Sequence, residues 1–325
     1  MIKKKFFRSY QFFLLIFLFV FAGAIGLINP SFFSMGTLFD VIRIQTIYIL
    51  LGFGLLPVVI LGGVDMSFVA IGALASFPIH YILEKAGYEG GIGLYYLWAI
   101  VIGIGVGALI SFLLTTFKLK IFDLSLGMNT LIYGFIVFFI DSRTNANLPE
   151  GLVGWNKKFM VTVHSVVGDS GLHISFLYII LAGILLHLLL NYTTLGRSIY
   201  AFGSDKSVAI RTGYNIRKTY LVVFALMGLM AGIAGVTYNV LQGNFRPYTF
   251  MGKNRQVLAA VVLGGASTKG GRGTVFGTLL GTFLVGLINQ AIVYLGFSTQ
   301  WFDAVIGVIF IIYAAFQSLT LEQKR

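Results

Sequence analysis

The sequence predicts an all-α, polytopic membrane protein of about ten transmembrane helices, with broken or re-entrant segments among them. Of its 325 residues, 58% are hydrophobic and 10% are charged, whereas a soluble domain carries about 25% charged residues. The apolar residues form continuous runs, unlike the short alternating strands of a membrane β-barrel. The Lys and Arg residues lie between these runs, which is typical of multi-pass helical proteins.

The same composition excludes other classes of protein. A chain this apolar is neither a soluble enzyme nor a disordered segment, and the absence of Cys excludes a disulfide-stapled domain. The net charge of +12 is a common signature of nucleic-acid binding. Because the basic residues cluster in the connections between apolar runs, we interpret the charge as a topology signal and expect no nucleic-acid partner.

Ten apolar runs are candidate membrane spans, because about 20 apolar residues cross about 30 Å of hydrocarbon. They are residues 11–29, 43–61, 66–83, 94–117, 121–140, 174–191, 219–241, 254–266, 274–295 and 301–319. The run 254–266 is too short to cross alone, so we expect it to be broken or re-entrant. With an even number of spans and the amino terminus inside, most Lys and Arg fall on the inner side, which predicts that both termini are cytoplasmic.

Residues 1–26 also resemble a cleavable secretory signal. They have a basic start, an apolar run and a candidate cleavage site at Ala22-Gly23-Ala24. The apolar run is longer than the 7–15 residues of a signal. We therefore favour a retained first span.

Two connections are long enough to contact partners. Residues 141–173 form an extracytoplasmic loop of mixed charge, and residues 192–218 form a basic, Gly-punctuated cytoplasmic loop. The other connections are short, so residues 1–325 are predicted to form a single transmembrane domain. The sequence lacks a Walker motif and paired His ligands, so we expect no catalytic residue, no metal site and no cofactor bound by this chain.

Asp65 is the strongest candidate for a functional group inside the membrane. It lies in Leu61-Gly62-Gly63-Val64-Asp65-Met66-Ser67, between two apolar runs. A carboxylate in a bilayer costs at least ~2.5 kcal/mol, so an intramembrane charge indicates function by default. One interpretation is a broken helix that lines a path. The alternative is a short cytoplasmic turn in which Asp65 caps the next helix.

A second break, Val261-Val262-Leu263-Gly264-Gly265-Ala266-Ser267, echoes the first and hints at an internal repeat. We predict that the two breaks contribute the residues of the translocation path, which are Gly62, Gly63, Asp65, Ser67, Gly264, Gly265 and Ser267. Glycines at four-residue spacing, such as Gly228 and Gly232, are interpreted as helix-packing stripes instead.

Three segments, in order along the chain, match a known pattern. The first is Leu61-Gly62-Gly63-Val64-Asp65-Met66-Ser67. The second is Thr194-Leu195-Gly196-Arg197-Ser198-Ile199-Tyr200-Ala201-Phe202-Gly203, followed by Ala209 and Thr212-Gly213-Tyr214-Asn215. The third is Ala259-Ala260-Val261-Val262-Leu263-Gly264-Gly265-Ala266-Ser267, followed by Gly270-Gly271-Arg272-Gly273. In these segments the sequence resembles the permeases of ribose-type ABC importers.

The resemblance implies a type II importer-like subunit that is not itself an enzyme. Such a subunit lies in the bacterial plasma (inner) membrane and pairs with a second copy or a paralogue. ATPase subunits supply ATP and Mg²⁺, and an extracytoplasmic solute-binding protein delivers the solute. The resemblance favours a monosaccharide, with nucleosides, autoinducer-like sugars and branched-chain amino acids as alternatives. The rival class is an ion-coupled secondary transporter, in which Asp65 would bind the coupling ion.

The resemblance also implies that loop 192–218 contacts the ATPase. Gly196 permits a turn, Ser204 or Asp205 caps a short helix, Gly213 ends it, and Arg197 pairs with an acidic residue of the ATPase. The predicted contact residues are Gly196, Arg197, Ala201, Gly203, Asp205, Ala209 and Gly213. The alternative is that the basic residues of this loop only set the topology.

Overall fold

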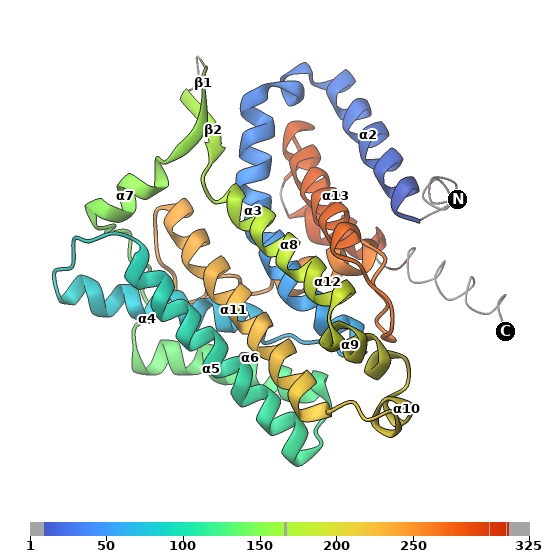
Figure 1. Cartoon of the computed structure of the whole chain (residues 1–325). Coiled ribbons are helices and arrows are strands. Elements are labelled where there is room, and N and C mark those ends of the chain that lie inside the picture. Colours follow the sequence, from blue (N-terminus) through green and yellow to red (C-terminus); the bar gives the residue numbers. More distant parts are fainter. Residues whose placement is uncertain (1–9, 166–167, 299, 310, 312–325) are drawn as a thin grey trace.

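Helices form most of the chain in the computed structural model, which describes residues 10–165, 168–298, 300–309 and 311 (Figure 1). In order they are α2 (Tyr10–Ile28), the 3-10 helix η1 (Pro30–Phe33), α3 (Met35–Ile60), α4 (Phe68–Lys85), α5 (Gly93–Phe117), α6 (Ile121–Phe139), α7 (Glu150–Asn156), α8 (Phe176–Tyr192), α9 (Thr194–Ser204), α10 (Lys206–Arg211), α11 (Ile216–Gln242), α12 (Asn254–Leu263) and α13 (Val275–Tyr294). Residues 301–309 are helical as well.

Among the described residues, six helices are long and apolar enough to cross a membrane: α3, α4, α5, α6, α11 and α13. The bent pair of α8 and α9 makes a seventh span if it is counted as one. Residues Leu14–Ile28 and Asn254–Leu263 form shorter apolar helices, and most of the predicted span 301–319 lies outside the described residues. The chain is therefore a multi-pass, helical membrane protein.

The first long helix begins eight residues before the predicted span 43–61. Ser34 precedes α3, and its Oγ accepts a hydrogen bond from the backbone N–H of Thr37 at 3.1 Å. This cap fixes the start of the helix at Met35. The charged residues Asp40 and Arg43 lie within its first turns, so they marked the edge of the apolar run and not the start of the helix.

The predicted loop 141–173 includes regular secondary structure. It contains α7 and a two-stranded antiparallel sheet of β1 (Phe159–Ser165) and β2 (Gly168–His173). The β-branched residues Val161, Thr162 and Val163 favour a strand, and this signal was available in the sequence. The strands stand at one end of the helices (Figure 1), and we call this the hairpin end.

Helix α11 lies at the centre of the bundle, against α3, α4 and α5. Its glycines bring it close to its neighbours: a Cβ on Gly228 would overlap the carbonyl of Gly103 in α5, and a Cβ on Gly235 would overlap that of Gly72 in α4. Because lipid is as apolar as a Leu side chain, helices in a bilayer associate through such close packing. The predicted packing stripe of Gly228 and Gly232 is confirmed, since Gly232 faces Ala99.

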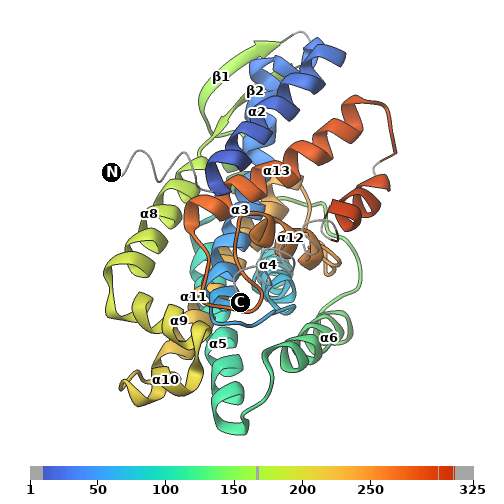
Figure 2. The same ribbon diagram turned by 90° about the vertical axis from the view of Figure 1, so that its right-hand side faces the viewer.

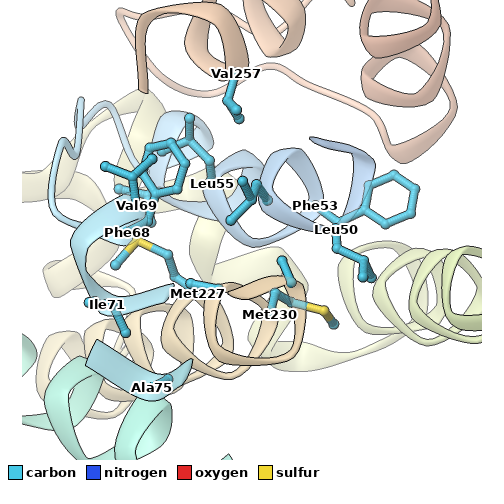
Figure 3. Close-up of a cluster of buried hydrophobic side chains, with 14 of the residues drawn as sticks. Leu50, Phe53, Leu55, Phe68, Val69, Ile71, Ala75, Met227, Met230 and Val257 are labelled. Carbon is cyan, nitrogen blue, oxygen red and sulfur yellow. The ribbon is translucent and has the colours of Figure 1, made fainter. Parts of the chain in front are cut away.

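Large apolar side chains fill the space that these close contacts leave. Figure 3 shows Leu50 and Leu55 of α3, Phe68 of α4, and Met227 and Met230 of α11 in one cluster. Phe68, Leu50, Leu55 and Met227 are each at most 1% exposed. A core of this density holds the helix ends in fixed positions.

The helices α9 and α10 lie at the end of the bundle opposite to the strands (Figures 1 and 2). We call this the α9–α10 end. The connections α3–α4 and α12–α13 reach the same end, because Gly62 of the first lies against Gly270 of the second and Gly270 lies against Gly203 of α9.

Candidate functional site at the α9–α10 end

Helix α9 leaves the bundle at a sharp bend after α8. The two helices meet at 72°, and the Oγ1 of Thr193 caps α9 by accepting a hydrogen bond from the N–H of Gly196 at 3.0 Å. A Cβ on Gly196 would overlap the carbonyl oxygens of Leu189 and Leu190 at the end of α8. Only glycine permits the two helices to approach this closely.

Hydrogen bonds join α9 to two other parts of the bundle. The hydroxyl of Tyr200 donates to the carbonyl of Gly273, in the α12–α13 connection, at 2.8 Å. The hydroxyls of Ser198 and Thr219 lie 2.9 Å apart, and Thr219 is in the first turn of α11. A displacement of α9 would therefore reach the ends of α11 and α13.

A third contact joins α9 to α3 through backbone alone. A Cβ on Gly203 would overlap the carbonyl of Ile60 and lie 2.6 Å from the N–H nitrogen of Gly271. That N–H donates to the carbonyl of Ile60 at 2.8 Å. Gly62 and Gly270 pack beside these atoms with φ of +84° and +89°. We call the four residues Gly62, Gly203, Gly270 and Gly271 the glycine junction.

Helix α10 follows α9 after a single capping residue. The Oδ1 of Asp205 accepts hydrogen bonds from the N–H groups of Ser207 (2.8 Å) and Val208 (3.0 Å) and from the Ser207 hydroxyl (2.7 Å). These hydrogen bonds hold the pKa of the Asp205 carboxyl below its ordinary value. Gly213 follows the helix with φ of +88° and ends it. Ala209 is buried and Ala201 is partly buried, so both pack inward.

The outer side of α9 and α10 exposes apolar and basic side chains together. Val208 is 52% exposed and Ile210 is 51% exposed, and the side chains of Arg197, Lys206 and Arg211 are exposed as well. We call these five residues the α9–α10 surface. Val208 and Ile210 were not among the predicted contact residues, although two aliphatic side chains in a basic, polar loop are a readable signal.

Asp65 caps the start of α4 through its side chain. Its Oδ1 accepts hydrogen bonds from the N–H groups of Ser67 (2.6 Å) and Phe68 (3.2 Å) and from the Ser67 hydroxyl (2.7 Å), at the start of α4. Asp65 is fully buried, and its Oδ2 has no partner among the described residues. Burial raises the pKa of its carboxyl to about 6, although these hydrogen bonds act to lower it.

The other residues predicted for the path share this location. Gly62 and Gly265, with φ of +84° and +92°, end α3 and α12 in the same way. Gly63 N donates to Val58 O, and Ala266 N donates to Val261 O. Both segments thus form the same helix-terminating motif, which accounts for their echo in the sequence. They are connections between helices at the α9–α10 end, where Gly264 packs on α13 and Ser267 shapes the turn before Arg272.

The hairpin end forms a second surface on the opposite side. Arg43 of α3 donates to the Oδ1 of Asn156 at 2.6 Å, which ties α7 to the bundle. His173 is buried beside Trp155, and burial lowers the pKa of His173 to about 4. A backbone bridge joins Asn145 to Phe245. The loop 141–173 is therefore anchored at several points.

No group of three or more His, Asp and Glu side chains in the described part of the chain is placed to hold a metal ion. Asp65, Asp205 and Tyr200 at the α9–α10 end hold caps and turns through their side chains. The arrangement can bind a partner and transmit movement.

The comparisons with known proteins agree with this architecture. The family model described as "Branched-chain amino acid transport system / permease component" matches residues 37–314. The chain belongs to this permease family.

The curated relatives include sugar-import permeases. The ribose import permease protein RbsC of Escherichia coli (strain K12) is 26% identical over 302 residues, which cover 92% of this chain and 90% of the relative. RbsC of Bacillus subtilis (strain 168) is 28% identical, with 95% and 91% covered. The autoinducer 2 import system permease protein LsrC of Yersinia enterocolitica is 29% identical, with 94% and 83% covered. No solved structure matches this chain.

Proposed function

We propose that this chain is the membrane-spanning permease subunit of an ATP-driven importer and that the α9–α10 surface binds the ATPase subunit. One observation carries the proposal: the helix that bears the exposed α9–α10 surface is joined to the ends of α13, α11 and α3 through Tyr200, Ser198 and Gly203, respectively. A loop that only set the topology would need the basic charges but not these internal contacts.

The contacts suggest how movement would pass into the membrane. The ATPase would bind Val208 and Ile210 in an apolar groove, while Arg197 pairs with an acidic side chain at the rim of that groove. Movement of α9 then displaces the glycine junction and, with it, the ends of α3 and α13. Because backbone contacts cannot adjust as flexible side chains do, the junction would transmit displacement as a rigid body. ATP and Mg²⁺ belong to the ATPase, and this chain binds no cofactor in the proposal.

The topology of the proposal places the α9–α10 end in the cytoplasm, with both termini on that side of a bacterial inner membrane. The basic residues of 192–218 support this placement. We propose about ten spans in a type II importer-like arrangement, with α2, α12 and the helix from residue 301 as the spans beyond the long helices. Two such chains, or this chain and a paralogue, would form the path between them.

The hairpin end is then the place where a solute-binding protein docks. Lys157 and Lys158 are exposed there, beside the exposed side chains of Met160 and Val161. The anchoring of this loop by Arg43 and His173 supports a preformed surface, which lowers the entropy lost on docking.

A monosaccharide is the proposed solute. Among the relatives, two are named for ribose import and one for autoinducer 2 import. Nucleosides, autoinducer-like sugars and branched-chain amino acids are the alternatives. The solute is identified most directly by the ligand that co-purifies with the cognate binding protein, because selection is made largely there.

Co-purification of the ATPase tests the proposed contact. Arg197→Glu reverses the charge of one residue of the exposed α9–α10 surface, and we expect it to abolish association with the ATPase while the chain remains folded. Lys158→Glu makes the same charge change at the hairpin end and serves as the matched control. If Arg197→Glu retains the ATPase and transports at the wild-type rate, the proposed coupling surface is wrong.

A further inference from the structure

A pocket of about 80 Å³ with both polar and apolar lining residues lies between α3, α12 and α13, beside Phe302 of the last described helix. Its polar lining consists of Gln45, Tyr48, Gln256, Thr282, Asn289 and Gln290. We call it the amide pocket after its four carboxamides. None of the predicted path residues lines it. Uncharged amide side chains between membrane helices are costly unless they are hydrogen-bonded, so four of them around one space require an explanation.

The carboxamide of Gln45 is the clearest sign of a ligand. Gln45 is 6% exposed, and no described residue forms a hydrogen bond with its side chain. A carboxamide has both donors and an acceptor, and those of Gln45 are available to a bound molecule. Gln256, also 6% exposed, donates from Nε2 to Asp303 at 3.3 Å, and its carbonyl oxygen remains free to accept.

The neighbouring backbone leaves room for this amide. A Cβ on Gly286 would overlap the side-chain amide of Gln45, so the glycine of α13 makes the space that Gln45 occupies. Thr282, one turn earlier, donates to the carbonyl of Thr278 at 2.8 Å and retains its lone pairs as acceptors.

Helix α12 begins at this pocket. It has ten residues, a length of about 15 Å, which is half of the roughly 30 Å of hydrocarbon. Because α12 ends beside the glycine junction, its first turn with Gln256 lies inside the bundle. Helices that begin at membrane depth are tolerated where they line a path or are covered by protein.

The lining also indicates the chemistry of the ligand. The lining residues include no Lys, Arg, Asp or Glu, and the carboxylate of Asp303 beside them accepts a hydrogen bond from Gln256, so an anionic solute would find no counter-charge there. Carboxamides both donate and accept hydrogen bonds, as hydroxyl groups require, and the rings of Tyr48 and Phe302 offer apolar faces. Ile44, another lining residue, is 43% exposed at the outside of the chain. A volume of this size receives one edge of a sugar ring.

We propose that the amide pocket is where the transported solute contacts this chain, and that it selects neutral, hydroxyl-rich molecules. The proposal rests on the proposed function as a permease. It places the path at the amide pocket, at a distance along α3 and α12 from the glycine-rich connections that the sequence analysis favoured.

Cysteine labelling tests whether water and solute reach the pocket. The chain contains no Cys, so a single substitution gives one reactive site. In membrane vesicles with the cognate ATPase and binding protein, we expect Asn289→Cys to react with an uncharged, water-soluble methanethiosulfonate during ATP turnover. Ile288→Cys is the matched control, because Ile288 is 4% exposed and faces an apolar cluster with α2. It should react only after denaturation. An unreactive Asn289→Cys would overturn the proposal, whatever the solute is.

Transport of D-ribose, used as the probe, tests the role of the amides. Gln45→Leu removes the hydrogen-bonding groups at similar volume, and we expect ATP-driven uptake at low concentration to fall about tenfold, as for a lost hydrogen bond in a buried site. Gly286→Ala should act in the same direction because it displaces Gln45. Gly105→Ala of α5, which has open space around its added Cβ, is the control and should leave uptake unchanged.

The outcomes separate this proposal from the proposed function. If uptake by the wild type requires ATP and the binding protein, but Gln45→Leu and Gly286→Ala transport normally, the amide pocket is wrong and the permease function stands. If the wild type shows no ATP-driven uptake of any solute that the binding protein carries, the function itself fails. The labelling of Asn289→Cys remains interpretable in both cases.

Discussion

Two short segments, Asp65-Met66-Ser67 and Asp205-Lys206-Ser207, form the same cap at the start of α4 and of α10. In each, one carboxylate oxygen accepts hydrogen bonds from two backbone N–H groups and from the Ser hydroxyl two residues later. Their surroundings differ, since Asp65 is fully buried near the glycine junction and Asp205 is exposed beside the α9–α10 surface.

The pKa values of the two carboxyls respond in opposite directions. Burial raises the pKa of Asp65 to about 6, whereas hydrogen bonds lower the pKa of the exposed Asp205. The same local motif therefore serves two purposes. At Asp65 it fixes a connection that cannot move without losing buried hydrogen bonds, and at Asp205 it holds a short helix in water, where a partner can reach it.

The largest effect is expected from removing the buried cap. Asp65→Ala would leave the N–H groups of Ser67 and Phe68 and the Ser67 hydroxyl without their acceptor, at a cost of about 3 kcal/mol in the free energy of unfolding. Asp65→Asn keeps an acceptor oxygen and should lose far less. Thermal unfolding of the detergent-solubilised chain measures both. Equal melting temperatures for Asp65→Ala and the wild type would show that the cap is dispensable.

The next effect separates a glycine in close backbone contact from an exposed one. A Cβ in Gly203→Ala would meet the backbone of Ile60 and Gly271, so α9 must shift and the folded yield or the melting temperature should fall by the equivalent of about 2 kcal/mol. Gly213→Ala meets no neighbour and carries only the strain of a positive φ, about 1 kcal/mol. A larger loss for Gly213→Ala would contradict the importance of the junction.

A smaller and more local effect is expected at the exposed cap. Asp205→Ala should cost α10 about 1 kcal/mol, leave the melting temperature of the bundle unchanged and weaken ATPase binding about fivefold. Ser207→Ala removes only the hydroxyl contact and should weaken binding less. Titration of the ATPase against the purified chain gives both affinities. A drop in melting temperature without loss of ATPase binding would show that Asp205 stabilises the bundle and not the ATPase contact.

The smallest effect concerns pH. Because the folded state binds the Asp65 proton more tightly than the unfolded state, the stability contributed by this group rises as the pH falls from about 6 toward its ordinary pKa of 3.8. The melting temperature of the wild type should therefore rise relative to that of Asp65→Asn on acidification. Parallel curves for the two proteins would mean that the Asp65 carboxyl has an ordinary pKa.

The helical membrane class and several helix ends could be predicted from the sequence. The apolar runs give the helical membrane class, and the left-handed glycines Gly62, Gly213 and Gly265 lie where helix-ending signals predict them. The location of Asp65 was not readable, because a cap in a connection and a charge in a broken span share one local sequence. The packing of the α12–α13 connection against Gly62 is a tertiary contact that the local sequence does not show.

The amide pocket was not readable for a similar reason. Gln45, Gln256 and Asn289 are separated along the chain and lie in three helices, so no local pattern joins them. A carboxamide in an apolar run was the only local signal. The exposure of Val208 and Ile210 also depends on which face of α10 packs through Ala209, a fact of tertiary structure.

The most direct test of the central claim is uptake by proteoliposomes that contain this chain with its ATPase, supplied with the cognate binding protein and its ligand. We expect uptake that requires this chain, the ATPase, the binding protein and ATP hydrolysis, and that persists when ion gradients are collapsed. Uptake by this chain alone, driven by a proton or sodium gradient without ATP, would contradict the central claim.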